Sequence, residues 1–328
     1  MADASVKEIN DGTLEVNPIL LNGHTNEEKI NELMVRLEEG IQNVFDSDSY
    51  KRYLSVMSKF HTYSYRNCML ILLQKPDATF VRGYQAWKKD KETGRHVKNG
   101  EKGIRIIVGN NKTIYKMTKE IDPNTGQEEQ KKVKVQIPYF SVGYVYDVSQ
   151  TEGKELPTLC NDLTAGVEDF NSRMEALKSI SPVPIEFEEI MGSGKGYFHR
   201  IEKRIAIKQG MSELQTLKTA IHEISHALLH DFNVADLKQG KAVFDKNLFE
   251  TQAESIAFIV CSYLGLDTSE YSFGYLASWS KSKELDELKS SLEIIHGTAK
   301  DIIEKMDVCQ KSRVKEKSKN KKLDIALI

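Results

Sequence analysis

The feature that most constrains this chain is a pair of histidines, His222 and His226, four residues apart with Glu223 beside the first. The surrounding residues 213–230 follow a capping-box pattern at Ser212 and are apolar at helical spacing, which predicts a helix. Side chains four residues apart share one helix face, so both imidazoles can bind one metal ion. Glu223 then lies where a carboxylate can act as general base for hydrolysis, as in zinc peptidases. We therefore predict a zinc site with Glu223 as its catalytic residue.

A third ligand is expected from the next predicted helix, residues 247–264. Glu250 and Glu254 lie one turn apart on one face of that helix. We expect Glu250 to complete a site of two histidines and one glutamate, and Glu254 to orient an imidazole N–H. Two alternatives remain open. The glutamates can exchange roles, or Asn247 can cap the helix with Glu250 as its capping-box partner.

His230 lies on the same predicted helix face as the paired histidines. At 1.5 Å per residue it is about 12 Å from His222 along the axis, too far to share an ion, so we expect it to support or pack against the site. Three tyrosines, Tyr197, Tyr271 and Tyr275, are candidates for stabilising an oxyanion. The alternative to a metal site is a helix with two half-buried histidines and a surface glutamate.

The length of 328 residues indicates two domains, and the hydrophobic periodicity predicts the α+β class. We expect a flexible N-terminus (residues 1–25), a first domain (26–152), a second domain with the predicted zinc site (153–308) and a basic tail (309–328). Proline and glycine make residues 150–158 the best linker candidate. The predicted helices are residues 27–45, 49–73, 163–180, 213–230, 247–264 and 283–306. The predicted strands are 79–81, 103–108, 113–117, 133–146, 185–187 and 197–207, with a turn at 122–126.

The cellular compartment follows from what the sequence lacks. The first ten residues are polar and acidic, without the basic and apolar regions of a secretory signal. The longest apolar stretch, residues 256–266, is too short to span a bilayer, so we expect no membrane partner. The four cysteines form no Cys-x-x-Cys pair, which suits a reducing compartment. We predict a cytoplasmic protein.

A segment of the N-terminal half, residues 61–109, interleaves aromatic residues with a basic cluster. This mixture suits single-stranded nucleic acid, because aromatic rings stack on bases while lysine and arginine follow the phosphates. Residue types alone leave the alternative open that the charges form a solvated surface and the aromatics a core.

Several motifs of this segment, in order, resemble the N-terminal single-stranded-DNA-binding domain of ArdC-type antirestriction proteins. They are Tyr-Ser-Tyr-Arg-Asn (63–67), Gln-Lys-Pro-Asp-Ala-Thr (74–79), Trp87, Val-Lys-Asn-Gly-Glu-Lys-Gly (97–103) and Tyr-Asp-Val-Ser-Gln-Thr (146–151). The motifs at 222–230, 250–254 and 275–279 resemble the zincin-type metallopeptidase domain of the same family. LtrC-like proteins of mobile elements, and metallopeptidases that cleave phage-type repressors, are similar groups.

The resemblance implies a protein of conjugative plasmids or transposons that binds single-stranded DNA and protects incoming DNA from restriction. From it and the segment's composition we expect ten residues to contact DNA: Tyr65, Arg66, Asn67, Arg82, Trp87, Lys88, Arg95, Lys98, Lys102 and Arg105. The alternative function is a zinc-dependent regulatory protease that cleaves a specific protein partner. The motif does not by itself decide whether the peptidase half is catalytic.

Overall fold

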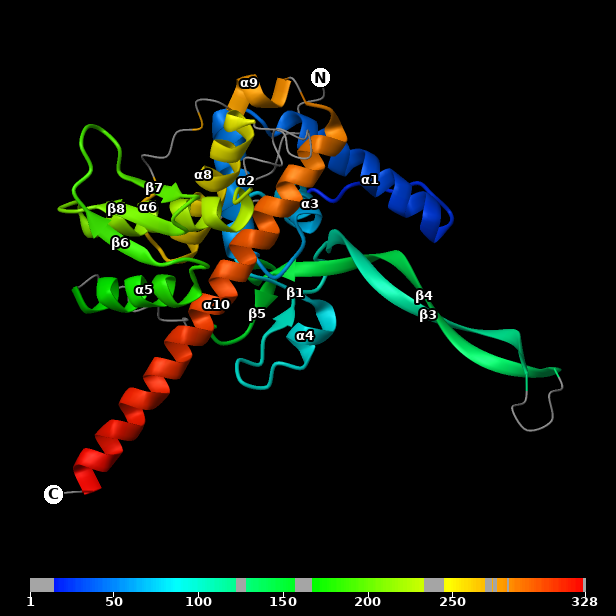
Figure 1. Cartoon of the computed structure of the whole chain (residues 1–328). Coiled ribbons are helices and arrows are strands. Elements are labelled where there is room, and N and C mark those ends of the chain that lie inside the picture. The colour runs from blue at the N-terminus through cyan, green and yellow to red at the C-terminus, as the bar shows by residue number, and fades with distance from the viewer. Residues whose placement is uncertain are drawn as a thin grey trace. The chain divides into compact units, whose positions relative to one another are not determined.

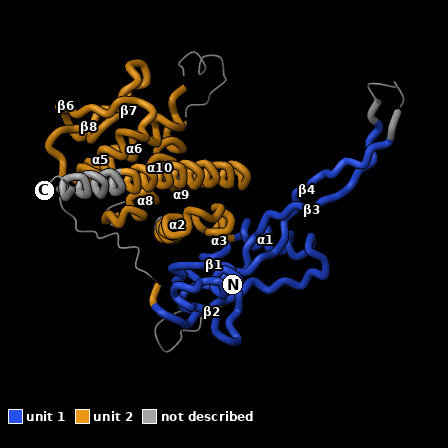
Figure 2. The backbone as a smooth tube through the Cα atoms, turned by 90° about the horizontal axis from the view of Figure 1, so that it is seen from below, with its two compact units in different colours: residues 1–39, 70–154 blue, residues 40–69, 155–328 orange. Residues whose placement is uncertain are grey.

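The computed structural model of the chain describes residues 15–121, 128–156, 167–232, 245–268, 273, 276–281 and 283–326. Helices and strands are mixed along these residues, as the α+β prediction requires, and the chain divides into two compact units. Unit 1 contains residues 1–39 and 70–154, and unit 2 contains residues 40–69 and 155–328 (blue and orange in Figure 2). Residues 40–69 of the N-terminal half therefore belong to unit 2.

Unit 1 is built mainly from strands (Figure 1). Helix α1 (Asn26–Asn43) begins in this unit, and helix α3 (Tyr65–Gln74) ends in it. Strands β1 (Val81–Gly83), β4 (Glu128–Asp147) and β3 (Ile104–Ile121) form one antiparallel sheet in the order β1-β4-β3. A second antiparallel pair joins β2 (His96–Val97) to β5 (Thr151–Glu152). The short helices α4 (Tyr84–Lys88) and η1 (Val148–Gln150) lie between these strands in the chain.

Strands β3 and β4 form a long two-stranded ribbon that projects from the rest of unit 1 (Figure 1). They pair continuously from Ile104 opposite Val145 to Ile121 opposite Glu128. The two short strands predicted at 103–108 and 113–117 are thus one strand, because residues 109–111 continue the ladder opposite 138–140. The turn predicted at 122–126 lies outside the described residues.

Unit 2 contains most of the helices and a three-stranded sheet. Strand β8 (Arg204–Lys208) is central, parallel to β6 (Ile185–Glu188) and antiparallel to β7 (Gly196–His199), so β7 is an edge strand. The prediction of one strand at 197–207 was wrong, because a turn at 200–203 separates β7 from β8. The helices are α2 (Ser47–Lys59), α5 (Val167–Ile180), α6 (Glu213–Leu229), α8 (Lys246–Tyr263), α9 (Leu276–Lys281) and α10 (Leu285–Ala326).

The packing of unit 2 places α6 between the sheet and α8. Ile205, Ala206 and Ile207 of β8 are all buried, as expected of a central strand, and α6 contacts both β7 and β8. Helix α8 packs against α6, α2 and α10, and its residues 255–261 are buried without interruption. A helix surrounded on several sides is apolar around most of its circumference. This packing gives α6 and α8 little freedom to move apart.

Two predicted helices differ from the observed ones. The helix predicted at 49–73 is divided into α2 and α3, because Ser64 caps a new helix, with its Oγ atom 3.3 Å from the backbone N–H of Asn67. The helix predicted at 283–306 continues as α10 to Ala326, into the region that we expected to be a basic tail.

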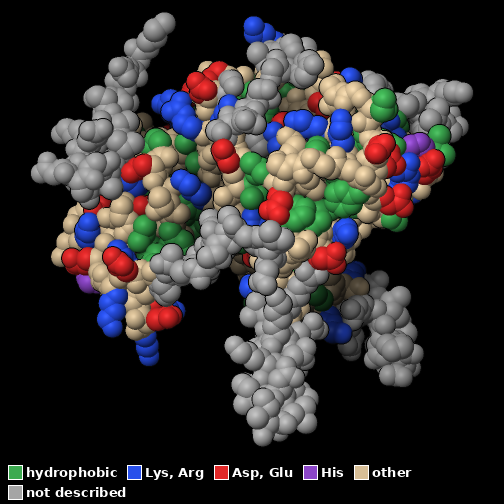
Figure 3. All heavy atoms as spheres, turned by 90° about the vertical axis from the view of Figure 1, so that its left-hand side faces the viewer, with side chains coloured by type: hydrophobic (Ala, Val, Ile, Leu, Met, Phe, Trp, Pro, Cys, Tyr) green, Lys and Arg blue, Asp and Glu red, His purple; other side chains and the backbone are tan. Residues whose placement is uncertain are grey.

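The surface charges, the helices and the cysteines each add one observation. Acidic, basic and apolar side chains are interspersed on the face drawn in Figure 3, so the described residues there form no large patch of one charge. In the described part of the chain, no helix is long and apolar enough to cross a membrane. Three cysteines, Cys68, Cys261 and Cys309, are free thiols, and Cys160 lies outside the described residues.

Candidate metal centre

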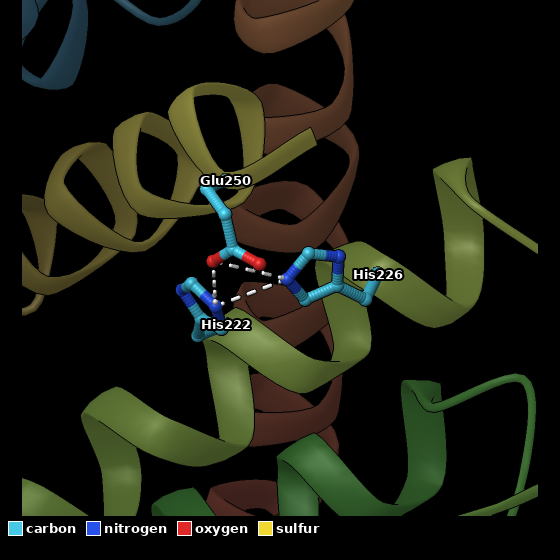
Figure 4. A group of neighbouring side chains, drawn as sticks. All are labelled: His222, His226 and Glu250. Carbon is cyan, nitrogen blue, oxygen red and sulfur yellow. Dashed lines mark hydrogen bonds and ion pairs between the residues drawn. The ribbon is translucent and has the colours of Figure 1, made fainter. Parts of the chain in front are cut away.

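Helix α6 carries both predicted histidines on one side and a buried apolar surface on another. It begins at Ser212, whose side chain accepts a hydrogen bond from the backbone N–H of Gln215, so the N-cap half of the predicted capping box is present. The Gln215 side chain instead bonds to Lys195 and Thr219. Leu217, Ala220, Ile221 and Ile224 are buried and fix the rotation of the helix. Because the helix cannot rotate without exposing this surface, the histidine side remains directed toward α8 (Figure 4).

Helix α8 carries Glu250 and Glu254 toward α6. It is capped by Asp245, whose carboxylate accepts a hydrogen bond from the backbone N–H of Leu248 at 3.0 Å. Asn247 therefore lies inside the helix, and Glu250 is not its capping-box partner. That alternative for Glu250 was wrong, and its carboxylate is left to face the histidines.

Three side chains converge between the helices, with ligand atoms that all lie within 4.8 Å of one another: His222, His226 and Glu250 (Figure 4). The two Nε2 atoms are 3.1 Å apart, and Oε2 of Glu250 lies 3.5 Å from Nε2 of His222 and 3.8 Å from Nε2 of His226. Tetrahedral zinc with ligands at about 2.05 Å separates neighbouring ligand atoms by about 3.3 Å. The observed distances bracket this value, so the donor set fits one such cation.

Glu254 lies on the other side of the first imidazole. Its Oε2 atom is 3.2 Å from Nδ1 of His222, and its Oε1 atom is 3.6 Å from Nζ of Lys218. An acceptor at Nδ1 holds the proton on that nitrogen and leaves Nε2 with a lone pair for a cation. The geometry favours Glu250 as the ligand and Glu254 as the residue that orients His222.

His226 is oriented by a chain of hydrogen bonds that runs away from the centre. Its Nδ1 atom is 2.8 Å from Nδ1 of His230, whose Nε2 atom is 3.0 Å from Oε1 of Gln252. Nε2 of Gln252 in turn donates to the hydroxyl of Ser291 at 3.3 Å. Burial lowers the pKa of His230 to about 4, so this imidazole is neutral and can accept a hydrogen bond at Nδ1 while donating one from Nε2. The whole chain is satisfied when Nδ1 of His226 donates to Nδ1 of His230 and Nε2 of His230 donates to Oε1 of Gln252. In this arrangement Nε2 of His226 carries no hydrogen.

The centre concentrates negative charge in a partly buried space. Burial raises the pKa of the Glu223 carboxyl. Although burial opposes a charge on His222, the carboxylates of Glu250 and Glu254 raise its pKa to about 10. The same imidazole holds the pKa of Glu250 well below its usual range. Three carboxylates around two imidazoles thus favour positive charge here, which a divalent cation would supply.

Glu223 is tied to the edge strand β7. The backbone N–H of Phe198 donates a hydrogen bond to its carboxylate, and the side chain is buried. A Cβ atom at Gly196 would lie 2.6 Å from Cγ2 of Thr219 and 2.9 Å from the carbonyl oxygen of Ala206. Only glycine therefore lets β7 approach α6 this closely. Of the tyrosines predicted near the centre, Tyr197 donates to Glu188 at 2.5 Å, and Tyr271 and Tyr275 lie outside the described residues.

Three of the predicted DNA contacts, Tyr65, Arg66 and Asn67, belong to the packed part of unit 2. Tyr65 and Asn67 are buried, and the backbone oxygen of Tyr65 accepts a hydrogen bond from Tyr53 at 2.7 Å. The guanidinium of Arg66 lies 4.8 Å from the centroid of the Tyr65 ring and 3.9 Å from Glu293. Because Tyr65 and Asn67 are buried, they offer no surface to a nucleic acid and are not direct contacts.

Trp87 is likewise part of a core, in unit 1. Its side chain is fully buried (0% exposed), and its indole N–H donates to the backbone oxygen of Tyr146 at 3.0 Å. Arg82 lies over this ring and forms an ion pair with Asp90 at 3.1 Å. A ring without an exposed face cannot stack on a base, so Trp87 is not a direct contact either.

The other basic residues predicted to contact DNA divide into two groups. Arg95, Lys98 and Arg105 hydrogen-bond to backbone oxygens of unit 1, including those of Lys154, Ser149 and Ile19, and hold its loops together. Lys88 and Lys102 are exposed. The sequence interpretation missed the chain from His230 to Ser291, because helical spacing does not show tertiary partners. It also missed the exposed aromatics of the ribbon, although the lysines at 131–134 followed by the aromatics at 139, 140 and 144 are visible in the sequence.

Comparison with known proteins assigns a family to each half of the chain. The N-terminal domain of the anti-restriction factor ArdC matches residues 24–146. The IrrE N-terminal-like domain, an M78 peptidase family, matches residues 179–268 and so includes α6 and α8.

Individual relatives are more distant. An uncharacterized protein of Bacillus anthracis is 29% identical over 332 residues, which cover 90% of this chain and 55% of that protein. The chain therefore spans about half the length of this relative. Crystal structures of the antirestriction ArdC protein from plasmid R388, metal-free and Mn(II)-bound, have TM-scores of 0.42 and 0.41 at 21% and 19% identity. Each of these two matches covers 75% of this chain and 83% of the ArdC chain. The chain therefore has the domain content of an ArdC-type protein, an ArdC N-terminal domain followed by an M78 peptidase-like domain.

Proposed function

We propose that this protein binds single-stranded DNA through its N-terminal domain, protects that DNA from restriction after conjugative entry, and binds one zinc ion in its C-terminal domain. The observation that carries the metal assignment is the convergence of His222, His226 and Glu250 at separations suited to one tetrahedral cation. The DNA assignment is supported by the ArdC match over residues 24–146. Such a role requires the cytoplasm, where entering DNA is exposed to restriction enzymes.

The residues of the centre suggest a hydrolytic, peptidase-type activity. His222, His226 and Glu250 would hold the zinc ion, and Glu254 and His230 would keep the two imidazoles in the required tautomers. Bound zinc would supply Lewis acidity toward a carbonyl group. The Glu223 carboxylate, next to His222 on α6, is placed to accept a proton and transfer it to a leaving group. The edge of β7 beside Glu223 could hold an extended peptide by strand addition.

The ArdC match favours the antirestriction role over the rival function, a regulatory protease for one protein partner. Salt dependence separates the two experimentally. Binding of DNA through phosphates weakens steeply as ionic strength rises, whereas binding of a peptide to a strand edge responds little.

The most informative experiment measures metal content and DNA binding on the same samples. We expect about one zinc per chain in the wild type and none in His222→Ala, because two remaining donors hold zinc poorly. His199→Ala removes a histidine outside the centre and should keep the metal. Equal zinc in wild type and His222→Ala would refute the assigned centre. A wild type that fails to bind single-stranded DNA in the parallel titration would refute the DNA-binding role.

A further inference from the structure

The two faces of the β3–β4 ribbon are distinguished by its register. In an antiparallel pair, residues directly opposite each other share a face, and alternate residues along each strand do the same. Tyr115 lies opposite Lys134, Met117 opposite Lys132, and Arg105 opposite Tyr144. Odd-numbered residues of β3 and even-numbered residues of β4 therefore form one surface. We call its exposed part the stacking face: Tyr115, Met117, Lys132, Lys134, Phe140 and Tyr144.

The aromatic rings of this face are exposed rather than packed. Tyr115, Phe140 and Tyr144 are 61%, 62% and 52% exposed, whereas Trp87 of the same unit is fully buried. Several large apolar side chains along one exposed surface mark a binding surface more often than scattered single ones do. Phe140 and Tyr144 are four residues apart on one strand, a rise of about 13 Å. Rings at this separation would contact different units of an extended ligand.

The charge of the ribbon identifies the kind of ligand. Residues 110–119 and 130–140 contain six lysines and no aspartate or glutamate. The acidic residues of the two strands lie at the ends of the ribbon, Glu120, Glu128 and Glu129 at the outer end and Asp147 at the inner end. On the stacking face, the ammonium group of Lys132 lies 4.8 Å from the centroid of the Tyr115 ring. An apolar protein interface is depleted of lysine at its centre, whereas nucleic-acid surfaces combine aromatic rings with cations. The combination therefore complements a polyanion with flat bases.

We propose that a single strand of DNA lies along the stacking face, with bases stacked on Tyr115, Phe140 and Tyr144 and phosphates beside Lys132 and Lys134. This inference rests on the proposed DNA-binding function and assigns its surface. A single strand fits better than a duplex, because only unpaired bases offer their faces for stacking. The ribbon could instead insert into a groove of duplex DNA or bind a second protein. The test below distinguishes these two alternatives from a single strand.

The ribbon provides its own matched controls, since Ile137 and Tyr139 are exposed on the opposite face of the same strand. We would titrate the full-length protein against a fluorescently labelled oligothymidylate and follow the anisotropy. Tyr115→Ala, Phe140→Ala and Tyr144→Ala should each weaken binding by about 5- to 100-fold. Tyr139→Ala and Ile137→Ala should remain within about twofold of wild type. Tyr115→Phe and Tyr144→Phe keep a stacking ring and should keep wild-type affinity, which separates stacking from loss of fold.

The outcomes are distinct. Selective loss in the stacking-face alanine variants, with retention in the phenylalanine variants, would support the inference. Equal affinities for variants of both faces, with normal wild-type binding, would overturn the assigned surface but leave DNA binding by the protein intact. Absence of wild-type binding would overturn both. Equal or tighter binding of a duplex of the same length, or loss of self-association without loss of DNA affinity, would also overturn the assignment.

Discussion

The α6–α8 centre and the β3–β4 ribbon place chemically important side chains in opposite ways. At the centre, His222, His226 and Glu250 converge between two helices that each bury an apolar surface. On the ribbon, exposed rings and lysines are spread along two strands, and only the inner end, near Ile104 and Val145, is buried. The first arrangement depends on every member, because a cation needs all its ligands. The second divides its binding energy among many similar contacts.

Unit 1 contains both a fully buried aromatic residue, Trp87, and an exposed one on the ribbon, Tyr144. We expect Trp87→Ala to lower the free energy of unfolding by about 3–5 kcal/mol, because it empties a fully buried site. Tyr144→Ala, the exposed control, should change it by about 0.5 kcal/mol or less. Urea titration followed by circular dichroism measures both. Similar losses in the two variants would show that the ribbon ring is packed in solution.

Removal of zinc should lower the free energy of unfolding, and this loss should require an intact centre. At free zinc one hundred times Kd, binding to the folded state adds about 2.7 kcal/mol to the free energy of unfolding, and a chelator should remove it. Glu250→Ala lacks one of the three converging donors and should show no such response to chelator. Thermal or urea unfolding with and without chelator tests this, and an equal shift in both proteins would place the metal elsewhere.

The hydrogen-bond chain behind His226 predicts a smaller effect. Gln252→Leu removes the acceptor for His230 at a buried position and should weaken metal affinity by about 10- to 100-fold. Gln252→Glu retains an acceptor and should lie closer to wild type. Competition with a chromophoric chelator gives the affinities. Wild-type affinity in the leucine variant would show that the chain does not support the ligand.

Single lysines on the ribbon should have the weakest effects. Lys132→Ala should reduce the slope of log K against log salt by about 0.7 if it contacts one phosphate of a single strand. Its affinity at moderate salt should fall only severalfold, unlike the loss expected of a metal ligand. Lys116→Ala, on the opposite face, is the matched control. Salt titrations of both give the slopes, and an unchanged slope in Lys132→Ala would remove that contact.

The centre was more accessible to prediction from sequence than the DNA surface. Helical spacing alone places His222 and His226 on one face, and one further helix with paired glutamates limits the third donor to two residues. The sequence favours Glu250 and leaves its exchange with Glu254 open, and the packing, which directs Glu254 to Nδ1 of His222, favours Glu250 as well. His230 could be excluded as a ligand from its rise along the helix, but its partner Gln252 comes from another helix.

Three of the predicted DNA contacts are buried, because residue type does not report burial. Tyr65 and Trp87 fit a stacking pattern in the sequence and Asn67 belongs to the motif at 63–67, yet all three are buried. The sequence predicts two short strands, 103–108 and 113–117, on either side of a segment that contains Gly-Asn-Asn at 109–111. Opposite them, residues 138–140 continue the pairing, and only that register shows which side chains share a face.

X-ray absorption spectroscopy of the zinc-loaded protein tests the central claim most directly, because it identifies the atoms bound to the ion. Two imidazole nitrogens and a carboxylate should give nitrogen and oxygen neighbours at about 2.0–2.2 Å, and His226→Ala should lose this spectrum. Sulfur neighbours at about 2.3 Å, or an unchanged spectrum in His226→Ala, would contradict a centre built from α6 and α8.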